Sequence, residues 1–344
     1  MAAVRNCRLI APCLVLACLV SVGCRDDSAI VVYTALDSEF SEPVLQQFTQ
    51  DSGIRVRPRF DTESTKTVGL TEAIISESRA GHVRCDVFWN NEILNTLRLR
   101  QRGLLDVYVS PVHKPYPAQY RAADGTWHGF AGRARVLIVN TDRVPQDQWP
   151  RSILDLTDPK WQGQAGIGKP LFGTTATHAA CLFAKWGDQR AKEFFRALRA
   201  NDVAIESGNK QVALRVASGQ LALGMTDTDD AIIEKEKGLP VAIIFPDSAP
   251  GELGTLFIPN TLAVIKGTRR GVQARQLIDY LLRPEVEQRL ARGPSAQIPL
   301  NPQAKIESRL DIPADIQAMQ VDFEQAAEKW EETAEFLRSE FLAP

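Results

Sequence analysis

The sequence predicts an α/β fold built from two lobes. Strand-like runs rich in β-branched residues alternate with helical patterns, which favours mostly parallel sheets. The chain has 344 residues, long enough for two hydrophobic cores. The apolar run from Cys85 to Trp89 is followed by Asn90, Asn91 and Glu92. Because ligands of open α/β sheets lie beyond the carboxyl ends of strands, we expect these three side chains to face a cleft. The alternative for this turn is structural, with Asn91 capping a helix that begins near Ile93.

The amino-terminal segment has the features of an export signal. Arg5 and Arg8 precede an uncharged apolar run that ends at Gly23 and is short for a bilayer span. We therefore predict that residues 1–23 are a signal peptide and that the protein is exported.

A lipid attachment site follows this signal. Cys24 comes directly after Ser21-Val22-Gly23 and before polar sequence, which resembles the lipobox of bacterial lipoproteins. We expect Cys24 to be the lipidated first residue, with residues 24–28 linking the membrane to the fold. Cys18 offers a competing box, but cleavage there would leave apolar residues at the new terminus. Cleavage near Cys24 without a lipid is the other alternative.

Composition excludes several classes of function. A formal charge of −2 argues against a nucleic-acid partner. The sequence has no phosphate loop, nucleophile elbow or paired metal-binding histidines, so we expect a protein that is not an enzyme and has no catalytic cofactor. Beyond Cys24 only Cys85 and Cys181 remain, and we expect both to be unpaired and buried.

The elements of the first half form a parallel unit. Residues 29–34 read as a strand, Asp37 lies in the turn after it, and a helix with apolar residues at helical spacing ends near Gly53. A second strand over 54–60 and a helix over 68–79 precede the strand that begins at Cys85. At the other end of the chain, we expect mostly amphipathic helix over 313–341.

The order of several segments resembles that of a known family, the periplasmic ferric-binding-protein type of solute-binding protein of ABC importers. No single segment is specific, but their order and spacing are, and the likeness covers nearly all of the mature chain. The segments that carry the resemblance are 31–35, 48–54, 86–89, 132–141, 154–161, 259–266 and 277–286.

This resemblance implies a type II periplasmic binding protein. Such a fold has two α/β lobes, each with a mostly parallel sheet, and a hinge of two crossing strands. We expect lobe 1 at 29–131 plus 262–310, and lobe 2 with the C-terminal helices at 132–261 plus 311–344. The resemblance also implies a monomer on the periplasmic or cell-surface side of a membrane, held there by its lipid, with an ABC permease and ATPase as partners.

Two polar helix starts are expected to border the cleft. Thr174 and Thr175 precede an apolar helix, so their amides and hydroxyls could hold an anion at its N-terminus. Asn209 opens the helix over 211–218. Ordinary N-capping is the alternative explanation for each of them.

An acidic loop follows the strand that ends at Met225. In iron-binding members of the resembled family, this loop carries adjacent tyrosine ligands, with a histidine after the first strand and a glutamate after the third. Here Thr228 and Asp229 stand in place of the tyrosines, Asp37 lies where the histidine would be, and only Glu92 is carried over. Because phenolate is a strong ligand of ferric ion, the usual ferric site is not expected.

Carboxylates crowded in a closing cleft need a cation, or else several of them point away or pair with Arg133 and Arg135. We therefore predict a small charged solute, first of all a metal cation such as ferric ion in an atypical site with a synergistic anion. The predicted metal ligands are Glu92, Asp227 and Asp229, and the wider binding set is Asp37, Asn90, Asn91, Glu92, Thr174, Thr175, Asn209 and Thr228. The alternatives are an organic amine or phosphonate solute, a ligand-sensing adaptor, and an exported metal-assisted hydrolase.

Overall fold

The computed structural model describes residues 2, 28–61, 68–305, 309–313 and 315–343. The predicted lipidation site Cys24, and the predicted signal peptide apart from Ala2, lie outside the described residues. Within the described ranges, no helix is both long and apolar enough to cross a membrane.

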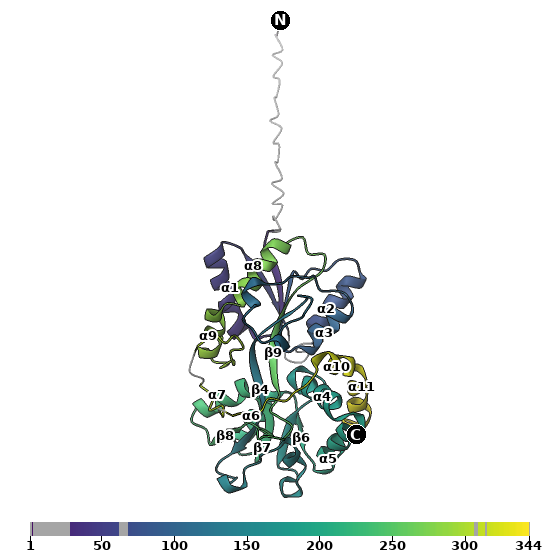
Figure 1. The fold of residues 1–344 in the computed structure, drawn as a ribbon, viewed down its shortest axis with the longest axis vertical. Helices are drawn as coiled ribbons and strands as arrows, with labels where there is room; N and C mark the ends of the chain where they lie inside the picture. The colour runs from purple at the N-terminus through teal and green to yellow at the C-terminus, as the bar shows by residue number, and fades with distance from the viewer. Residues whose placement is uncertain (1, 3–27, 62–67, 306–308, 314, 344) are drawn as a thin grey trace.

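The protein has two lobes stacked along its long axis (Figure 1). In the upper lobe, β1 pairs in parallel with β2 on one side and with β3 on the other. This confirms the predicted strand, helix, strand order, with each helix connecting two parallel strands. Its elements are β1 (Ile30–Thr34), α1 (Ser38–Ser52), β2 (Val56–Phe60), α2 (Val68–Arg79), β3 (Val87–Asn90) and α3 (Leu94–Gln101).

Two long strands join the lobes. β4 (His128–Asn140) and β9 (Phe257–Val264) pair antiparallel where the lobes meet, and β9 also pairs with β3 (Figure 1). The pairing shifts register between Phe130 and Gly132, and Ala131 between them has a φ of 40°. The buried Glu287 carboxylate accepts the Ala131 amide at 2.6 Å, which holds this bulge in place.

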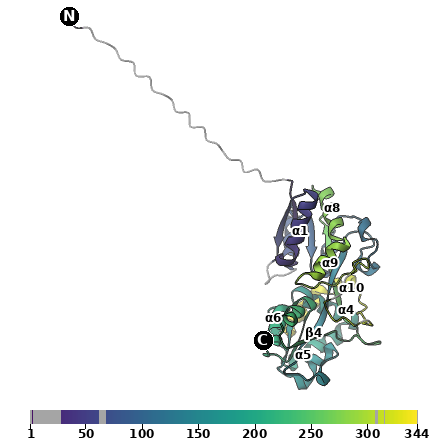
Figure 2. The same cartoon turned by 90° about the vertical axis from the view of Figure 1, so that its left-hand side faces the viewer.

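The lower lobe repeats the parallel arrangement. β5 pairs in parallel with β6 and β7, while β4 joins this sheet antiparallel to β7 and β8. The predicted α/β class is confirmed, and the antiparallel pairs all involve the crossing strands. Figure 2 shows α5 and α6 of this lobe below α1, α8 and α9 of the other. The elements are β5 (Ala165–Gly168), α4 (Gly173–Trp186), α5 (Asp188–Ala200), β6 (Ala204–Glu206), α6 (Asn209–Ala217), β7 (Leu223–Asp227), α7 (Thr228–Glu236) and β8 (Val241–Ile244).

After β9 the chain returns to the upper lobe through α8 (Gly271–Leu281) and α9 (Pro284–Arg292). The expectation of helix from residue 313 onward is wrong for its first part, because helix begins only at Phe323. Before that, Met319 donates its amide to the Thr255 carbonyl and Thr255 donates to the Gln317 carbonyl, so this stretch runs extended beside the crossing strand. The helices that follow are α10 (Phe323–Glu328) and α11 (Trp330–Phe336).

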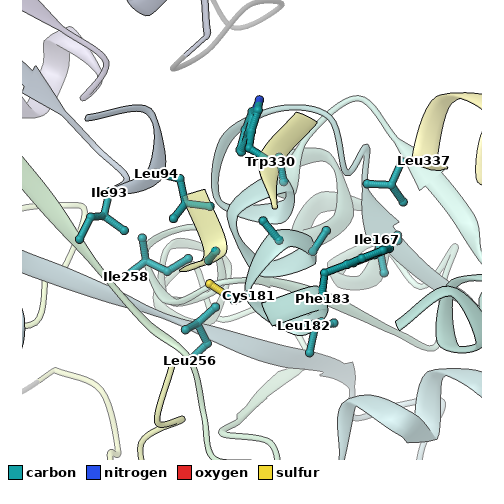
Figure 3. Close-up of a cluster of buried hydrophobic side chains, with 14 of the residues drawn as sticks. Ile93, Leu94, Ile167, Cys181, Leu182, Phe183, Leu256, Ile258, Trp330 and Leu337 are labelled. Atoms are coloured by element: carbon teal, nitrogen blue, oxygen red, sulfur yellow. The ribbon is translucent and has the colours of Figure 1, made fainter. Parts of the chain in front are cut away.

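The largest apolar cluster surrounds α4. Figure 3 shows Cys181 among Leu256, Ile258 and other apolar side chains, with Trp330 of α11 nearby. Cys85 and Cys181 are both buried and unpaired, as the sequence predicted. A cluster of this kind, which takes side chains from distant parts of the sequence, fixes the position of α4 against the crossing strands.

Two buried histidines pack against each other at the start of β4, with their rings tilted by 59°. The rings of His113 and His128 lie 4.9 Å apart between centroids, and His113 Nε2 lies 2.9 Å from the Gly129 carbonyl. Burial, followed by the charge of His128, lowers the pKa of His113 to about 3, and burial lowers the pKa of His128 to about 4. Both rings are therefore neutral in the folded protein at ordinary pH.

This pair predicts that acid weakens the fold. Unfolded histidine titrates near pH 6.5, so below that pH the unfolded chain binds protons that the folded chain does not. We expect this pair to lower the free energy of unfolding by about 2 to 4 kcal/mol between pH 6.5 and 5, measured by urea denaturation. Changing both residues to glutamine should reduce the slope and leave the part due to the buried His178, whose pKa burial also lowers, whereas changing the exposed His82 should not reduce it. An equal slope in the double variant would contradict the prediction.

Candidate functional site

A cavity of about 750 Å³ lies between the two lobes. The first lobe supplies the turn after β1 and the residue after β3, and the second lobe supplies the starts of α4, α6 and α7. A molecule held here would touch both lobes at once. The lining consists of Leu36, Asp37, Glu39, Phe40, Asn91, Arg133, Pro294, and residues 169, 172–175, 207–211, 214, 227, 229, 230, 233, 234 and 237.

A buried ion pair lies behind the cavity wall, and of its two residues only Asp227 lines the cavity. Arg135 on β4 and Asp227 on β7 are cross-strand partners, and Arg135 Nη1 donates to Asp227 Oδ1 at 2.6 Å. Their side chains are 0% and 4% exposed, so both charges depend on each other and on nearby hydrogen bonds. Pairing of these acids with Arg135 was the predicted alternative to a bound cation.

Thr174, Thr175 and Asn209 complete this ion pair. The residues at the N-cap positions of α4 and α6 are Phe172 and Gly208, and neither helix start has a side-chain cap bond. Asn209 instead donates to Asp227 at 3.0 Å and accepts from Arg135 at 3.0 Å. The Thr174 hydroxyl donates to Asp227, and the Thr175 hydroxyl donates to Asn209 at 2.9 Å. The structure thus brings these three predicted site residues together in one network rather than in separate caps.

Glu92 lies outside the cavity, contrary to the expectation that it faces the cleft. It is fully buried, and its carboxylate accepts the amides of Leu94 and Asn95 at 2.6 and 2.9 Å. It also accepts from Asn90 and from the Thr177 hydroxyl of α4, each at 2.8 Å. Glu92, and not Asn91, therefore satisfies the orphan amides that open α3. Of Asn90, Asn91 and Glu92, only Asn91 lines the cavity.

Thr228 is also turned away from the cavity. Its buried hydroxyl accepts the Ala134 amide at 3.2 Å, which ties the start of α7 to β4. Asp37, Asp229 and Asp230 do line the cavity. One carboxylate oxygen from each of Asp227, Asp229 and Asp230 can be chosen so that all lie within 4.8 Å of one another, close enough to share a cation.

Arg133 lines the cavity, although the sequence indicated it only as a partner for excess acids. It lies two residues before Arg135, so both side chains emerge on the same face of β4. Arg133 is 4% exposed, and its Nη1 lies 3.5 Å from Asp229 Oδ2. Burial lowers its pKa, but the carboxylates of Asp229, Asp227 and Asp230 outweigh burial and leave the pKa above its ordinary value. The two-residue spacing of Arg133 and Arg135 on one strand is the sequence feature that could have predicted a shared face.

Comparison with known sequences places these features in a family. Residues 96–329 match the model of a family described as bacterial extracellular solute-binding protein. The Fe(3+)-binding periplasmic protein of Serratia marcescens is 27% identical over 58% of this chain, and the match spans only 56% of that relative. The major ferric iron-binding protein of Neisseria meningitidis serogroup A is 25% identical over 87% of this chain and 89% of its own. These matches confirm the resemblance seen in the sequence.

Solved structures share the two-lobed fold. Iron-bound HitA from Pseudomonas aeruginosa aligns with a TM-score of 0.79 at 21% identity, over 89% of this chain and 98% of that one. The periplasmic binding protein AfuA from Actinobacillus pleuropneumoniae, with exogenous fructose-6-phosphate bound, aligns with a TM-score of 0.79 at 22% identity, over 92% and 99%. At this level of identity the likeness concerns the fold alone.

The position of Glu92 generates a prediction that separates structure from ligand binding. Replacing Glu92 with alanine leaves two amides and two side-chain donors without their buried acceptor, so we expect the free energy of unfolding to fall by at least about 2 kcal/mol. The exposed Glu335→Ala should change it by less than about 0.5 kcal/mol. Urea denaturation measures both. An unfolding free energy unchanged in Glu92→Ala would show that the cap contributes little.

Proposed function

Because this chain belongs to the family of bacterial extracellular solute-binding proteins, we propose that it captures a small charged solute between its lobes and delivers it to an ABC importer. The observation that carries this proposal is the cavity lined from both lobes, with Asp37 and Asn91 on one side and Thr175 and Asp229 on the other. A solute that contacts both sides favours the closed arrangement, which is the state an importer can recognise. The proposal contains no catalytic step.

A metal cation is the first candidate solute. Two curated relatives are named for binding ferric iron, and the oxygens of Asp227, Asp229 and Asp230 are close enough for a hard cation. Asp230 replaces Glu92 among the proposed metal ligands, because the oxygens of Glu92 accept hydrogen bonds from the start of α3. Among the described residues, no tyrosine lines the cavity, so ferric ion would be held by carboxylates and a synergistic anion.

An organic solute is the second candidate, and the basic residues of the cavity favour it. Arg133, Lys169 and Lys210 line the same space as the acids, so the cavity offers partners to both signs of charge. A volume of about 750 Å³ is in the range that holds small organic ligands and exceeds what a single ion requires.

The location of the protein is part of the same proposal. We propose export through the signal at residues 1–23 and anchoring through a lipid on Cys24, which leaves a monomer tethered on the periplasmic or cell-surface side. A tether of four residues to Ser28 spans at most about 15 Å, so the upper lobe would stay beside the membrane that holds the lipid. A ligand-sensing adaptor would share this anchoring and differ only in its partner.

Solute binding can be measured as thermal stabilisation. A ligand at about one hundred times its Kd should add roughly 2.7 kcal/mol to the free energy of unfolding. We expect at least one member of a panel of ferric salts with citrate or phosphate, amines, phosphonates and aminophosphonates to do so. Changing Asp229 and Asp230 together to asparagine should remove most of this stabilisation, and Asp311→Asn, outside the cavity, should preserve it. A panel without any stabilising member would contradict the proposal.

Lipid anchoring is tested in the cell envelope. Acylated protein should remain with membranes and partition into detergent, because an acyl chain contributes about 0.8 kcal/mol for each buried methylene. Cys24→Ser should lose both properties, whereas Cys18→Ser should keep them. Wild-type protein that is wholly soluble, with a mature terminus at another residue, would reject the anchor.

A further inference from the structure

The end of the upper lobe at which β1 begins is basic. β2 and β3 are parallel to β1 and begin at this end too, while β9 is antiparallel to β3 and ends there. α8, which follows β9, lies at the top of this lobe in Figure 1. The exposed basic side chains in the turns at this end and at the end of α2 form what we call the upper basic face. They are Arg55, Arg79, Arg84, Lys266 and Arg269.

Hydrogen bonds hold these turns together around the buried carboxylate of Asp86. It accepts the Val31 amide at 2.8 Å and lies 3.4 Å from Nη1 of Arg270, so it joins the start of β1 to the turn after β9. On the other side of β1, Arg55 donates to the Ser28 hydroxyl at 3.2 Å. The turns that carry the upper basic face are therefore fixed beside Ser28.

The acids near this face offset only part of its charge. Each of them is bonded within the fold, and they are Asp51, Glu77, Asp86 and Asp106. Among the residues that the structure describes, Arg79, Lys266 and Arg269 have no ion-pair partner. The whole chain has a formal charge of −2, so this face has the opposite sign to the protein that carries it. Such a local excess of charge attracts a partner of the other sign.

The proposed lipid site indicates which negatively charged surface this face meets. Cys24 precedes Ser28 by four residues, which span at most about 15 Å. The headgroups of the membrane that holds the lipid would thus lie within reach of the turns bonded around Ser28. Each Lys or Arg near an anionic lipid surface strengthens binding about fivefold. An acidic protein surface would match the same charge, but no feature of the chain brings one to Ser28.

We infer, resting on the proposed lipid anchor, that the upper basic face binds the anionic phospholipid surface of the membrane that holds Cys24. Stable anchoring by lipid generally needs a second contribution, and a group of basic residues is one that serves. An acyl tether alone leaves the protein free to turn. Contact through the upper basic face sets its orientation, with the upper lobe on the membrane and the lower lobe pointing away from it (Figure 1).

Vesicle binding without the acyl chain tests this face by itself. The chain from residue 24 onward, with Cys24→Ser, contains the two-lobed fold and can be sedimented with vesicles at low ionic strength. The vesicles are phosphatidylcholine, either pure or with about one third phosphatidylglycerol. We expect the anionic vesicles to bind at least about 30-fold more strongly than the neutral ones, because several basic residues contribute together. Most of this binding should be lost in about 0.5 M salt, which screens exposed charges.

Lys266→Gln combined with Arg269→Gln should weaken binding to the anionic vesicles by about 10- to 30-fold, since each side chain contributes about fivefold. Lys185→Gln combined with Arg190→Gln is the matched control. It removes the same charge from exposed residues of α4 and α5 in the lower lobe, so binding should stay within twofold of the parent chain. Circular dichroism and the Tm should show that both double variants are folded.

The outcomes separate this inference from the proposed function. Equal binding to neutral and anionic vesicles, or equal losses in the two folded double variants, would overturn the inference and leave solute capture and acylation untouched, since those are measured by thermal stabilisation and detergent partitioning. Charge-dependent binding to the solubilised permease without binding to vesicles would assign the face to an acidic protein surface and likewise overturn it. Vesicle binding by a protein that is not acylated in the cell would refute the proposed anchor, and with it the contact with that membrane.

Discussion

The ion pair between Arg135 and Asp227 is the constraint on which the rest of the site depends. It joins the crossing strand β4 to β7 and gathers the starts of α4 and α6 through Thr174, Thr175 and Asn209. Breaking one partner of such a buried pair leaves an uncompensated charge, typically at a cost of about 3 to 5 kcal/mol. This network therefore holds the polar residues at the starts of α4 and α6 in fixed positions beside the cavity.

The crossing strands connect this hydrogen-bond network of the second lobe to the first lobe. The bulge at Ala131 lies where β4 passes between the lobes, and Glu287 holds it with one carboxylate oxygen while its other oxygen accepts the Asn301 amide at 2.7 Å. Arg133 follows this bulge by two residues, so a change of angle between the lobes moves its guanidinium relative to the first-lobe residue Asp37. Lobe geometry and the charge pattern of the cavity are coupled through a few residues of β4.

The sequence predicted the fold better than it predicted the site. Hydrophobic periodicity located β1, α1, β2 and α2 to within about two residues, because local pattern decides such elements. The prediction for Glu92 was wrong, because in the sequence a carboxylate that caps a helix cannot be told from one that faces a ligand. The periodicity also failed near residue 317, where backbone pairing with Thr255 overrides helical propensity. The bonds of Arg135 to Asn209 and Thr174 could not be predicted either, because those two residues are distant from it in sequence.

The burial of Arg133 bears on how the lobes would close under the proposed function. A charged guanidinium between the lobes is costly to bury, and the nearest carboxylate oxygen, Asp229 Oδ2, lies 3.5 Å from its Nη1. A charged solute that contacts both lobes adds interactions that the empty cavity lacks, so it favours the closed arrangement. Closure then depends on the presence of solute, which is what a carrier needs in order to present a loaded state distinct from an empty one.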